Sequence, residues 1–123
     1  MSKFSLKSRA SSFKHAFNGL IYLIKNEPNF RIHLAAAILS VCLGFYLKIS
    51  ALEWIALTIC IGLVMATETL NTALEELCDL IHPEQHPKIK NTKDLGAAAA
   101  LVTAVTALLI GLIIFIPKLF YSC

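Results

Sequence analysis

Apolar residues are gathered into three long segments, which short polar clusters separate. The segments cover 30–47, 54–81 and 95–116, and Trp54 is the first residue of the second. A bilayer core about 30 Å thick is crossed by roughly 20 helical residues at about 1.5 Å each. We therefore predict an all-α integral membrane protein whose three transmembrane helices lie within these ranges.

The segment before the first span has an amphipathic pattern. Over 11–26 its apolar residues recur at helical spacing, with Ser11 or Ser12 as the predicted N-cap and residues 1–10 expected to fray. The apolar positions are Phe13, Ala16, Phe17, Leu20, Ile21 and Ile24. A basic amphipathic helix beside a span is expected to lie in the membrane interface. The alternative is a helix that packs on the protein's own loops.

Prolines and polar clusters mark the predicted helix ends. Pro28 interrupts the chain before the first span, and 48–50 forms a short turn after it. The polar stretch 82–91 contains two prolines, so we predict a loop there. Thr92-Lys93-Asp94 is predicted to open the third span, and Pro117 to end it.

Composition and charge suit a single small membrane domain over 1–123. The mean hydropathy is +0.70, and six of the eleven Lys and Arg residues lie before the first span or in its first turn. Three more lie in 82–94, and only Lys48 and Lys118 fall on the other side. The positive-inside rule then places the N-terminus in the cytoplasm and the C-terminus outside. We expect no cleaved signal peptide, and no disulfide from the four scattered cysteines.

A line of polar side chains continues the second apolar segment. At about 100° per residue, Glu68, Asn71, Glu75 and Asp79 fall within a strip roughly 80° wide. An acid inside a hydrophobic span costs about 2.5–3.5 kcal/mol even on lenient scales, so it indicates function. If Trp54 marks the outer interface, Glu68 lies about 21 Å and Glu75 about 31 Å along the helix. Glu68 is then at the cytoplasmic edge of the hydrocarbon, while Glu75 and Asp79 meet water.

This arrangement has the groups that phosphate chemistry needs. The five glycines are isolated, so no glycine-rich nucleotide loop exists, and we expect no nucleic-acid partner. Mg²⁺ prefers one or two carboxylates with phosphate oxygens, which Glu75 and Glu27 would provide. Lys93 offers a charge for phosphate. Glu68, deeper in the membrane, would accept a proton from a lipid hydroxyl.

Three other interpretations of these residues remain. Glu68 and Asn71 would serve as hydrogen-bonding contacts between membrane helices. Glu68 would be the proton relay of a small proton-coupled transporter. Cys78, His82 and His86, spaced by four, would bind a metal, although two prolines break the helix that would align them.

Three motifs together resemble the prokaryotic diacylglycerol kinase and undecaprenol kinase family. They are Asn26-Glu27…Phe30-Arg31, Glu68-x-Leu70-Asn71-Thr72-Ala73-Leu74-Glu75-x-x-x-Asp79 and Lys93-Asp94-x-Gly96-Ala97-Ala98. The resemblance extends from about Arg9 to Ile116. It implies a homotrimeric lipid kinase of the bacterial inner membrane, with three spans per subunit and a surface N-terminal helix. Such an enzyme transfers the γ-phosphoryl group of ATP to a lipid alcohol with Mg²⁺, at cytoplasmic sites shared between adjacent subunits.

The resemblance also implies roles for individual residues. Glu68 and Asn71 are matched to the family's catalytic residues, with Glu68 similar to the general base and Asn71 supporting the metal and ATP ligands. Glu68 and Arg31 are matched to lipid binding. Glu27 and Glu75 are matched to the metal and ATP ligands. The remaining residues matched to ATP binding are Asp79, Glu84, His86, Lys93, Asp94 and Arg9. His15 stands where many members have Tyr.

The acceptor lipid is suggested by three stretches of sequence. Arg31-Ile32-His33, Glu53-Trp54 and the run from Pro83 to Pro87 resemble the undecaprenol kinase branch of the family. We therefore expect undecaprenol as the acceptor and diacylglycerol as the alternative. The residues themselves give no physical basis for this choice, because both lipids present one hydroxyl at the interface.

Overall fold

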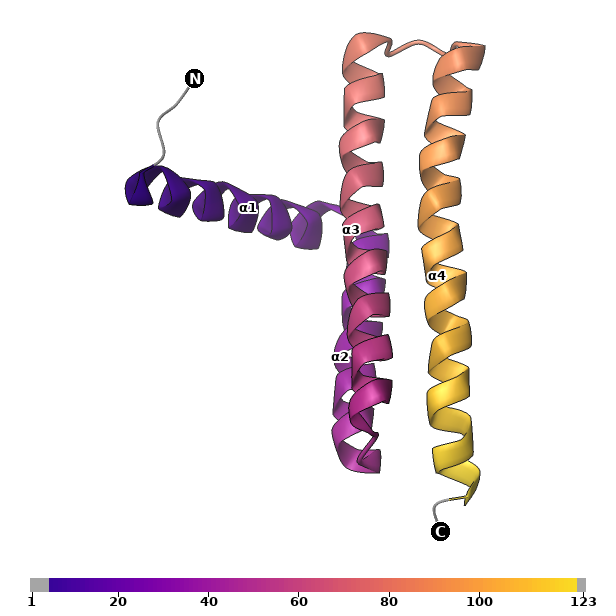
Figure 1. Cartoon of the computed structure of the whole chain (residues 1–123). Helices are drawn as coiled ribbons and strands as arrows, with labels where there is room; N and C mark the ends of the chain where they lie inside the picture. The colour runs from indigo at the N-terminus through magenta and orange to yellow at the C-terminus, as the bar shows by residue number, and fades with distance from the viewer. Residues whose placement is uncertain (1–4, 122–123) are drawn as a thin grey trace.

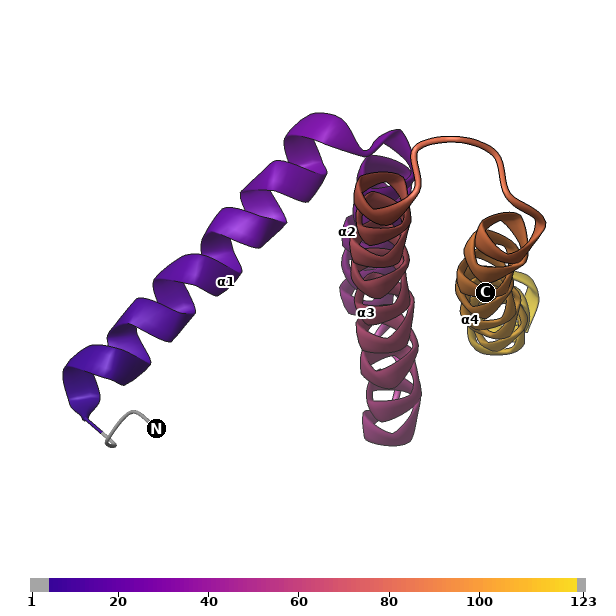
Figure 2. The same ribbon diagram turned by 90° about the horizontal axis from the view of Figure 1, so that it is seen from above.

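Four helices make up the structure, a computed structural model that describes residues 5–121. They are α1 (Leu6–Asn26), α2 (Pro28–Leu47), α3 (Ala51–Ile81) and α4 (Pro87–Tyr121), and the described residues contain no strand. The helices α2, α3 and α4 run alongside one another, and α1 extends away across their direction (Figures 1 and 2). By length and composition α2, α3 and α4 are each able to cross a membrane. The predicted all-α membrane architecture is confirmed.

Helix α1 begins earlier than the sequence pattern indicates. Ser5 caps it, since its side chain accepts a hydrogen bond from the amide of Ser8 at 3.0 Å. The predicted cap at Ser11 or Ser12 is therefore wrong, as is the fraying predicted for 5–10; residues 1–4 lie outside the described part of the chain. Both inner serines lie within the helix, because residues 6–10 contain no glycine or proline that would prevent α1 from starting after Ser5.

The apolar face of α1 is open to its surroundings. The exposed fraction is 68% for Phe13 and 62% for Phe17, and the side chains of Leu20 and Ile24 are exposed as well. An amphipathic helix with an uncovered apolar face, joined to a span, is typical of a helix that lies in the membrane interface.

The turn between α2 and α3 is closely specified by its residues. Lys48 adopts a left-handed conformation with φ of 53° and ends α2. Ser50 and Glu53 form a capping box, in which the Ser50 amide donates to Glu53 Oε1 at 2.8 Å and the Glu53 amide donates to Ser50 Oγ at 3.2 Å. Helix α3 consequently begins at Ala51, before the predicted residue 54.

Helix α4 is longer than predicted at both ends. Pro87 begins it, because a proline in the first turn loses no helical hydrogen bond. Residues 87–91, predicted as part of the loop, are therefore helical, and Thr92-Lys93-Asp94 lies inside α4 rather than opening it. Only 82–86 connects α3 to α4. The prediction that Pro117 ends the helix is also wrong, since α4 continues through it to Tyr121. Membrane helices tolerate an internal proline where neighbouring groups satisfy the freed backbone.

Helices α3 and α4 pack side by side along much of their length (Figures 1 and 2). The hydroxyls of Thr67 and Thr103 are hydrogen-bonded at 2.7 Å between them. Gly96 allows a close approach, because a Cβ there would lie 2.5 Å from Asn71 Oδ1. The buried apolar cluster lies at the other end of the bundle and includes Leu57 and Phe115. The polar line of α3 is thus held against α4 by small and hydroxyl side chains.

Candidate active site

One continuous helix carries the four polar residues that the sequence places on a single strip. Because α3 is unbroken from Ala51 to Ile81, Glu68 and Asp79 share a face and stand about 16 Å apart along the axis. The Glu68 side chain is 12% exposed, whereas that of Asp79 is 62% exposed. The strip therefore runs from a covered position among the helices to an open one near the α3–α4 turn.

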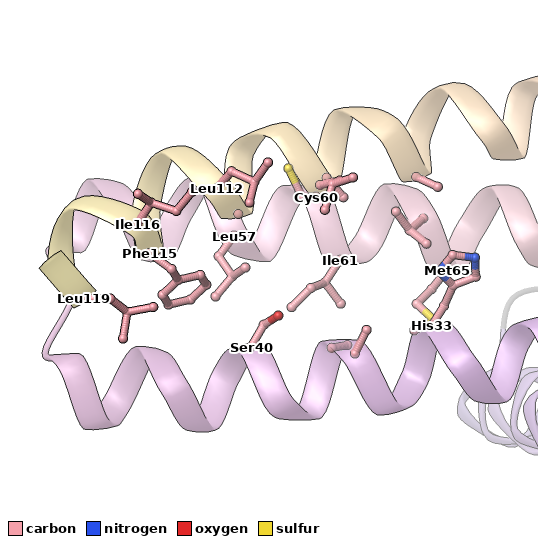
Figure 3. Close-up of a pocket in the computed structure, with 17 residues that line it drawn as sticks. His33, Ser40, Leu57, Cys60, Ile61, Met65, Leu112, Phe115, Ile116 and Leu119 are labelled. Carbon is pink, nitrogen blue, oxygen red and sulfur yellow. The ribbon is translucent and has the colours of Figure 1, made fainter.

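At the covered end, Glu68 faces α2. Nε2 of His33 lies 3.2 Å from Glu68 Oε1. His33 also lines an apolar cavity of about 420 Å³ between α2, α3 and α4. Figure 3 shows His33 and Met65 at one end of this cavity and Leu119 at the other. Sequence reasoning used His33 only as a marker of the lipid branch, and no spacing in the sequence indicates its contact with Glu68.

In the middle of the strip, Asn71 links two of the predicted site residues. Its Nδ2 donates a hydrogen bond to Glu75 Oε1 at 3.2 Å. Its Oδ1 is buried beside Gly96 and has no hydrogen-bond partner among the described residues. A buried polar oxygen without a partner is uncommon in folded proteins and is often found at functional positions.

At the open end, an ion pair connects α3 and α4. The Lys93 ammonium donates to Asp79 Oδ1. Glu84, His86, Lys93 and Asp94 line one hollow of about 510 Å³ at the α3–α4 turn. Four of the residues matched to ATP binding are therefore brought to one place, next to the end of the α3 strip.

The turn itself is ordered by its histidines. His82 Nδ1 lies 2.7 Å from the Glu84 carbonyl oxygen, and the Lys88 amide donates to His86 Nδ1 at 3.1 Å. The rings of His82 and His86 pack edge to face. Within 5–121 no three His, Cys, Asp or Glu side chains are grouped so that they could hold a metal. Cys78, His82 and His86 therefore do not form a metal site in this structure.

Glu27 stands at the corner between α1 and α2, where it ends one helix and begins the next. The neighbouring Tyr22 donates a hydrogen bond to Glu76 on α3. That bond and the negative charges of Glu76 and Glu27 raise the pKa of Tyr22 above its ordinary value. The corner is thereby held beside the Glu75–Glu76 turn of α3. Sequence reasoning missed Tyr22 and Glu76, which are 54 positions apart with no pattern to join them.

Arg31 and Arg9 are the two arginines predicted as site residues, and the structure places them differently. Arg31 donates from Nη1 to the carbonyl oxygens of Ile24 at 2.9 Å and Lys25 at 3.1 Å, so it binds the C-terminal turn of α1. Arg9 lies about 27 Å along α1 from Glu27. Figure 1 shows that end of α1 pointing away from α3, so one chain does not bring Arg9 to the polar strip.

Comparison with known proteins gives a consistent result. Residues 14–115 match the family model of prokaryotic diacylglycerol kinase. The undecaprenol kinase of Bacillus subtilis is 43% identical over 88% of each chain. The diacylglycerol kinase of Synechocystis is 37% identical over 88% of this chain and 62% of that protein. The diacylglycerol kinase of Escherichia coli K12 is 33% identical over 77% of this chain and 78% of that protein.

Proposed function

The chain belongs to the prokaryotic diacylglycerol kinase family and is a membrane lipid kinase, and we propose that it phosphorylates undecaprenol, with diacylglycerol as the alternative acceptor. The undecaprenol kinase of Bacillus subtilis is more similar to this chain than the two diacylglycerol kinases described above. The sequence Arg31-Ile32-His33 supports the same choice.

The observation that carries the proposal is the polar strip of α3, which connects two different environments. At one end Glu68 is covered by apolar helices, and at the other Asp79 pairs with Lys93 beside an open hollow. A lipid kinase must bring a membrane-embedded hydroxyl to a water-soluble phosphate donor. Phosphoryl transfer depends mainly on positioning and charge stabilisation, which a rigid helix with fixed side chains can supply.

Each group on the strip then has a defined task. Glu68 accepts the proton of the lipid hydroxyl as the hydroxyl oxygen attacks the γ-phosphorus of ATP. The bond from the γ-phosphorus to the bridging oxygen breaks, and ADP leaves with its electron pair. Asn71 orients the Glu75 carboxylate through its amide hydrogen bond. Lys93 contributes positive charge toward the phosphate oxygens, and Asp79 holds its ammonium in place. Glu84, His86 and Asp94 border the hollow in which we place the nucleotide.

The side chains also suit Mg²⁺. We infer that Glu75 and Glu27 hold the ion, because hard Mg²⁺ takes one or two carboxylates and completes its shell with phosphate oxygens and water. A dedicated cluster of three protein ligands, which the described residues lack, is not required for such a site. When bound, the ion neutralises charge on the phosphates.

We further propose that the active form is a homotrimer in the bacterial inner membrane. The N-terminus and the site would be cytoplasmic and the C-terminus outside, as the distribution of Lys and Arg favours. A shared site would explain why Arg9 lies far from the polar strip of its own chain. Arg31, bound to the end of α1, would act on the lipid indirectly by fixing the α1–α2 corner.

The test uses the purified protein in mixed micelles with labelled ATP and Mg²⁺. Undecaprenol and diacylglycerol are offered at equal mole fraction, separately and together, and the labelled lipids are separated. Faster transfer to undecaprenol is expected. Faster transfer to diacylglycerol would overturn the acceptor, and transfer to neither lipid by folded protein would overturn the function.

A further inference from the structure

His33 and Glu68 form a polar pair inside an otherwise apolar region. Nε2 of His33 lies 3.2 Å from Glu68 Oε1, and the exposed fractions of the side chains are 26% and 12%. We propose that His33 is a positioning residue that orients the Glu68 carboxylate toward the lipid hydroxyl. This inference rests on the proposed lipid kinase function and adds a residue from a second helix to the reacting end of the strip.

A single hydrogen-bond donor can orient a carboxylate, because only one of the two carboxylate oxygens is then bound to the donor and the other is left open. Nε2 of His33 comes from α2 to within 3.2 Å of Oε1. With the proton on Nε2, we assign it the role of donor to Oε1, which fixes the rotation of the carboxylate and leaves Oε2 to accept the proton of the lipid hydroxyl. In surroundings of low polarity such a hydrogen bond is stronger than in water, and an unpaired charge is costly. The pair therefore selects one orientation of Glu68 out of several.

The surroundings of the pair support this assignment. His33 lines the end of the apolar cavity shown in Figure 3, with Ala36 and Ala37 one turn further along α2. All the residues that line this cavity lie in the described part of the chain, and none of them is an Asp, Glu, Lys or Arg. The titratable side chains among them are His33 and Cys60. Glu68 on α3 is thus the charged partner of His33. The residues of α4 that line the cavity offer no charged partner.

A packing role for His33 is the competing explanation, and ring and amide substitutions separate the two. His33→Phe keeps a ring of similar size and removes the donor. His33→Gln removes the ring and carries an amide N–H to nearly the position of Nε2, whereas His33→Asn carries the same amide one methylene short of it. If the donor matters, Gln retains function and Phe and Asn lose it. If the ring matters only for packing, Phe retains function and Gln loses it.

The experiment measures kcat and KM for lipid and for ATP in the full-length protein, with wild type assayed in parallel. We expect His33→Phe and His33→Asn to lower kcat about ten- to hundredfold at little change in KM for ATP, and His33→Gln to stay within about threefold of wild type. Each variant is first checked for an unchanged oligomer size and helical content. An inactive wild type would overturn the proposed function, whereas an active wild type with a fully active His33→Phe would overturn only this inference.

A double-mutant cycle provides the second readout. If His33 acts through Glu68, adding His33→Phe to Glu68→Gln should cost no further activity, because the group that it orients is already absent. A further tenfold fall in the residual rate of the double variant would show that His33 acts independently, and would overturn the assignment.

Discussion

The phenol of Tyr22 on α1 donates a hydrogen bond to the carboxylate of Glu76 on α3. This bond connects the interfacial helix to the helix that carries the polar strip. Because Glu76 follows Glu75 directly, the bond holds the end of α1 that precedes Glu27 beside the turn of α3 that carries Glu75. Helix α1 is thereby connected to the helix that carries the polar strip.

Removing the phenol hydroxyl should loosen this corner. In Tyr22→Phe we expect faster amide hydrogen exchange over residues 18–26 and a higher KM for ATP, because Glu27 is no longer held beside α3. The value of kcat at saturating ATP should change little. Tyr46→Phe, at an exposed position of α2, is the matched control and should leave both quantities unchanged. Equal exchange in the wild type and Tyr22→Phe would contradict the tether.

The pH dependence of this tether follows from its chemistry. The bond to Glu76 raises the pKa of Tyr22 above its ordinary value of 10.0, so the protonated phenol is favoured in the folded protein. Its stabilisation is fully present below the unfolded-state pKa and is lost as the pH rises through the folded-state pKa. The ratio of exchange rates between Tyr22→Phe and wild type should therefore stay constant from about pH 6 to pH 9 and fall toward one at higher pH. A ratio that changes near neutral pH would implicate another group.

Glu68→Gln should reduce lipid-dependent ATP consumption to a small residual rate. The amide is almost isosteric with the carboxylate and can still hydrogen-bond to His33, so the helical content and oligomer size should match wild type. It cannot accept the hydroxyl proton, so the rate should fall at least about a hundredfold, as for the loss of a general base. ATP consumption is measured with and without lipid. Retained activity would mean that Glu68 is only a contact between helices.

Much of the fold could be predicted because membrane helices leave strong patterns in sequence. Apolar length alone identified α2, α3 and α4. The ends were less predictable, since the helical segment 87–91 is polar and resembles a loop. A proline such as Pro87 is also found both after the end of a helix and in the first turn of one. The failure at Pro117 has a related cause, because a single lost hydrogen bond near a helix end does not stop a helix that its neighbours support.

The site was predictable to the extent that it lies on one helix. The spacing of Glu68, Asn71 and Glu75 places them on one face whatever surrounds the helix. The contacts of His33 and Tyr22 depend on how α2 and α1 are rotated and placed against α3, and helical period carries no information about this. Contacts between helices therefore had to come from the structure.

Glu75→Gln should raise the Mg²⁺ requirement. If Glu75 is a metal ligand, replacing a carboxylate oxygen with a neutral amide weakens the binding of a hard cation. We expect the Mg²⁺ activation curve at fixed ATP to move to higher concentration by about tenfold or more, with activity partly recovered at high Mg²⁺. The curve is measured from the initial rate of lipid phosphorylation.

A matched acid for this experiment lies at the other end of the same helix. Glu53 is at position N3 of α3 and pairs with Lys118 at 3.4 Å, far along the helix from the polar strip. Glutamine also serves at N3 of a capping box, so Glu53→Gln should fold and keep the wild-type Mg²⁺ curve. Overlapping curves for Glu75→Gln and wild type would remove Glu75 from the metal site.

Gly96→Ala should damage both the α3–α4 contact and the polar strip. A Cβ at this position would lie 2.5 Å from Asn71 Oδ1 and 2.9 Å from Leu74 Cδ2, so the side chains of α3 or the helix itself must move. Overpacking of this kind costs about 1–3 kcal/mol. Displacing Asn71 also breaks its hydrogen bond to Glu75, so we expect lower thermal stability together with reduced lipid phosphorylation.

Gly62 provides the comparison that isolates this effect. It lies on α3, and a Cβ added there would have no atom within 4 Å beyond its two chain neighbours and the backbone of its own helix, so Gly62→Ala meets no steric resistance from the rest of the described chain. Alanine in a helix is favoured over glycine by about 0.5–1 kcal/mol, which predicts equal or higher stability for Gly62→Ala. Both variants are compared by thermal unfolding in the same detergent and by initial rate. A Gly96→Ala protein as stable and active as Gly62→Ala would mean that α3 and α4 tolerate a wider separation, and that Asn71 does not depend on the close approach of α4.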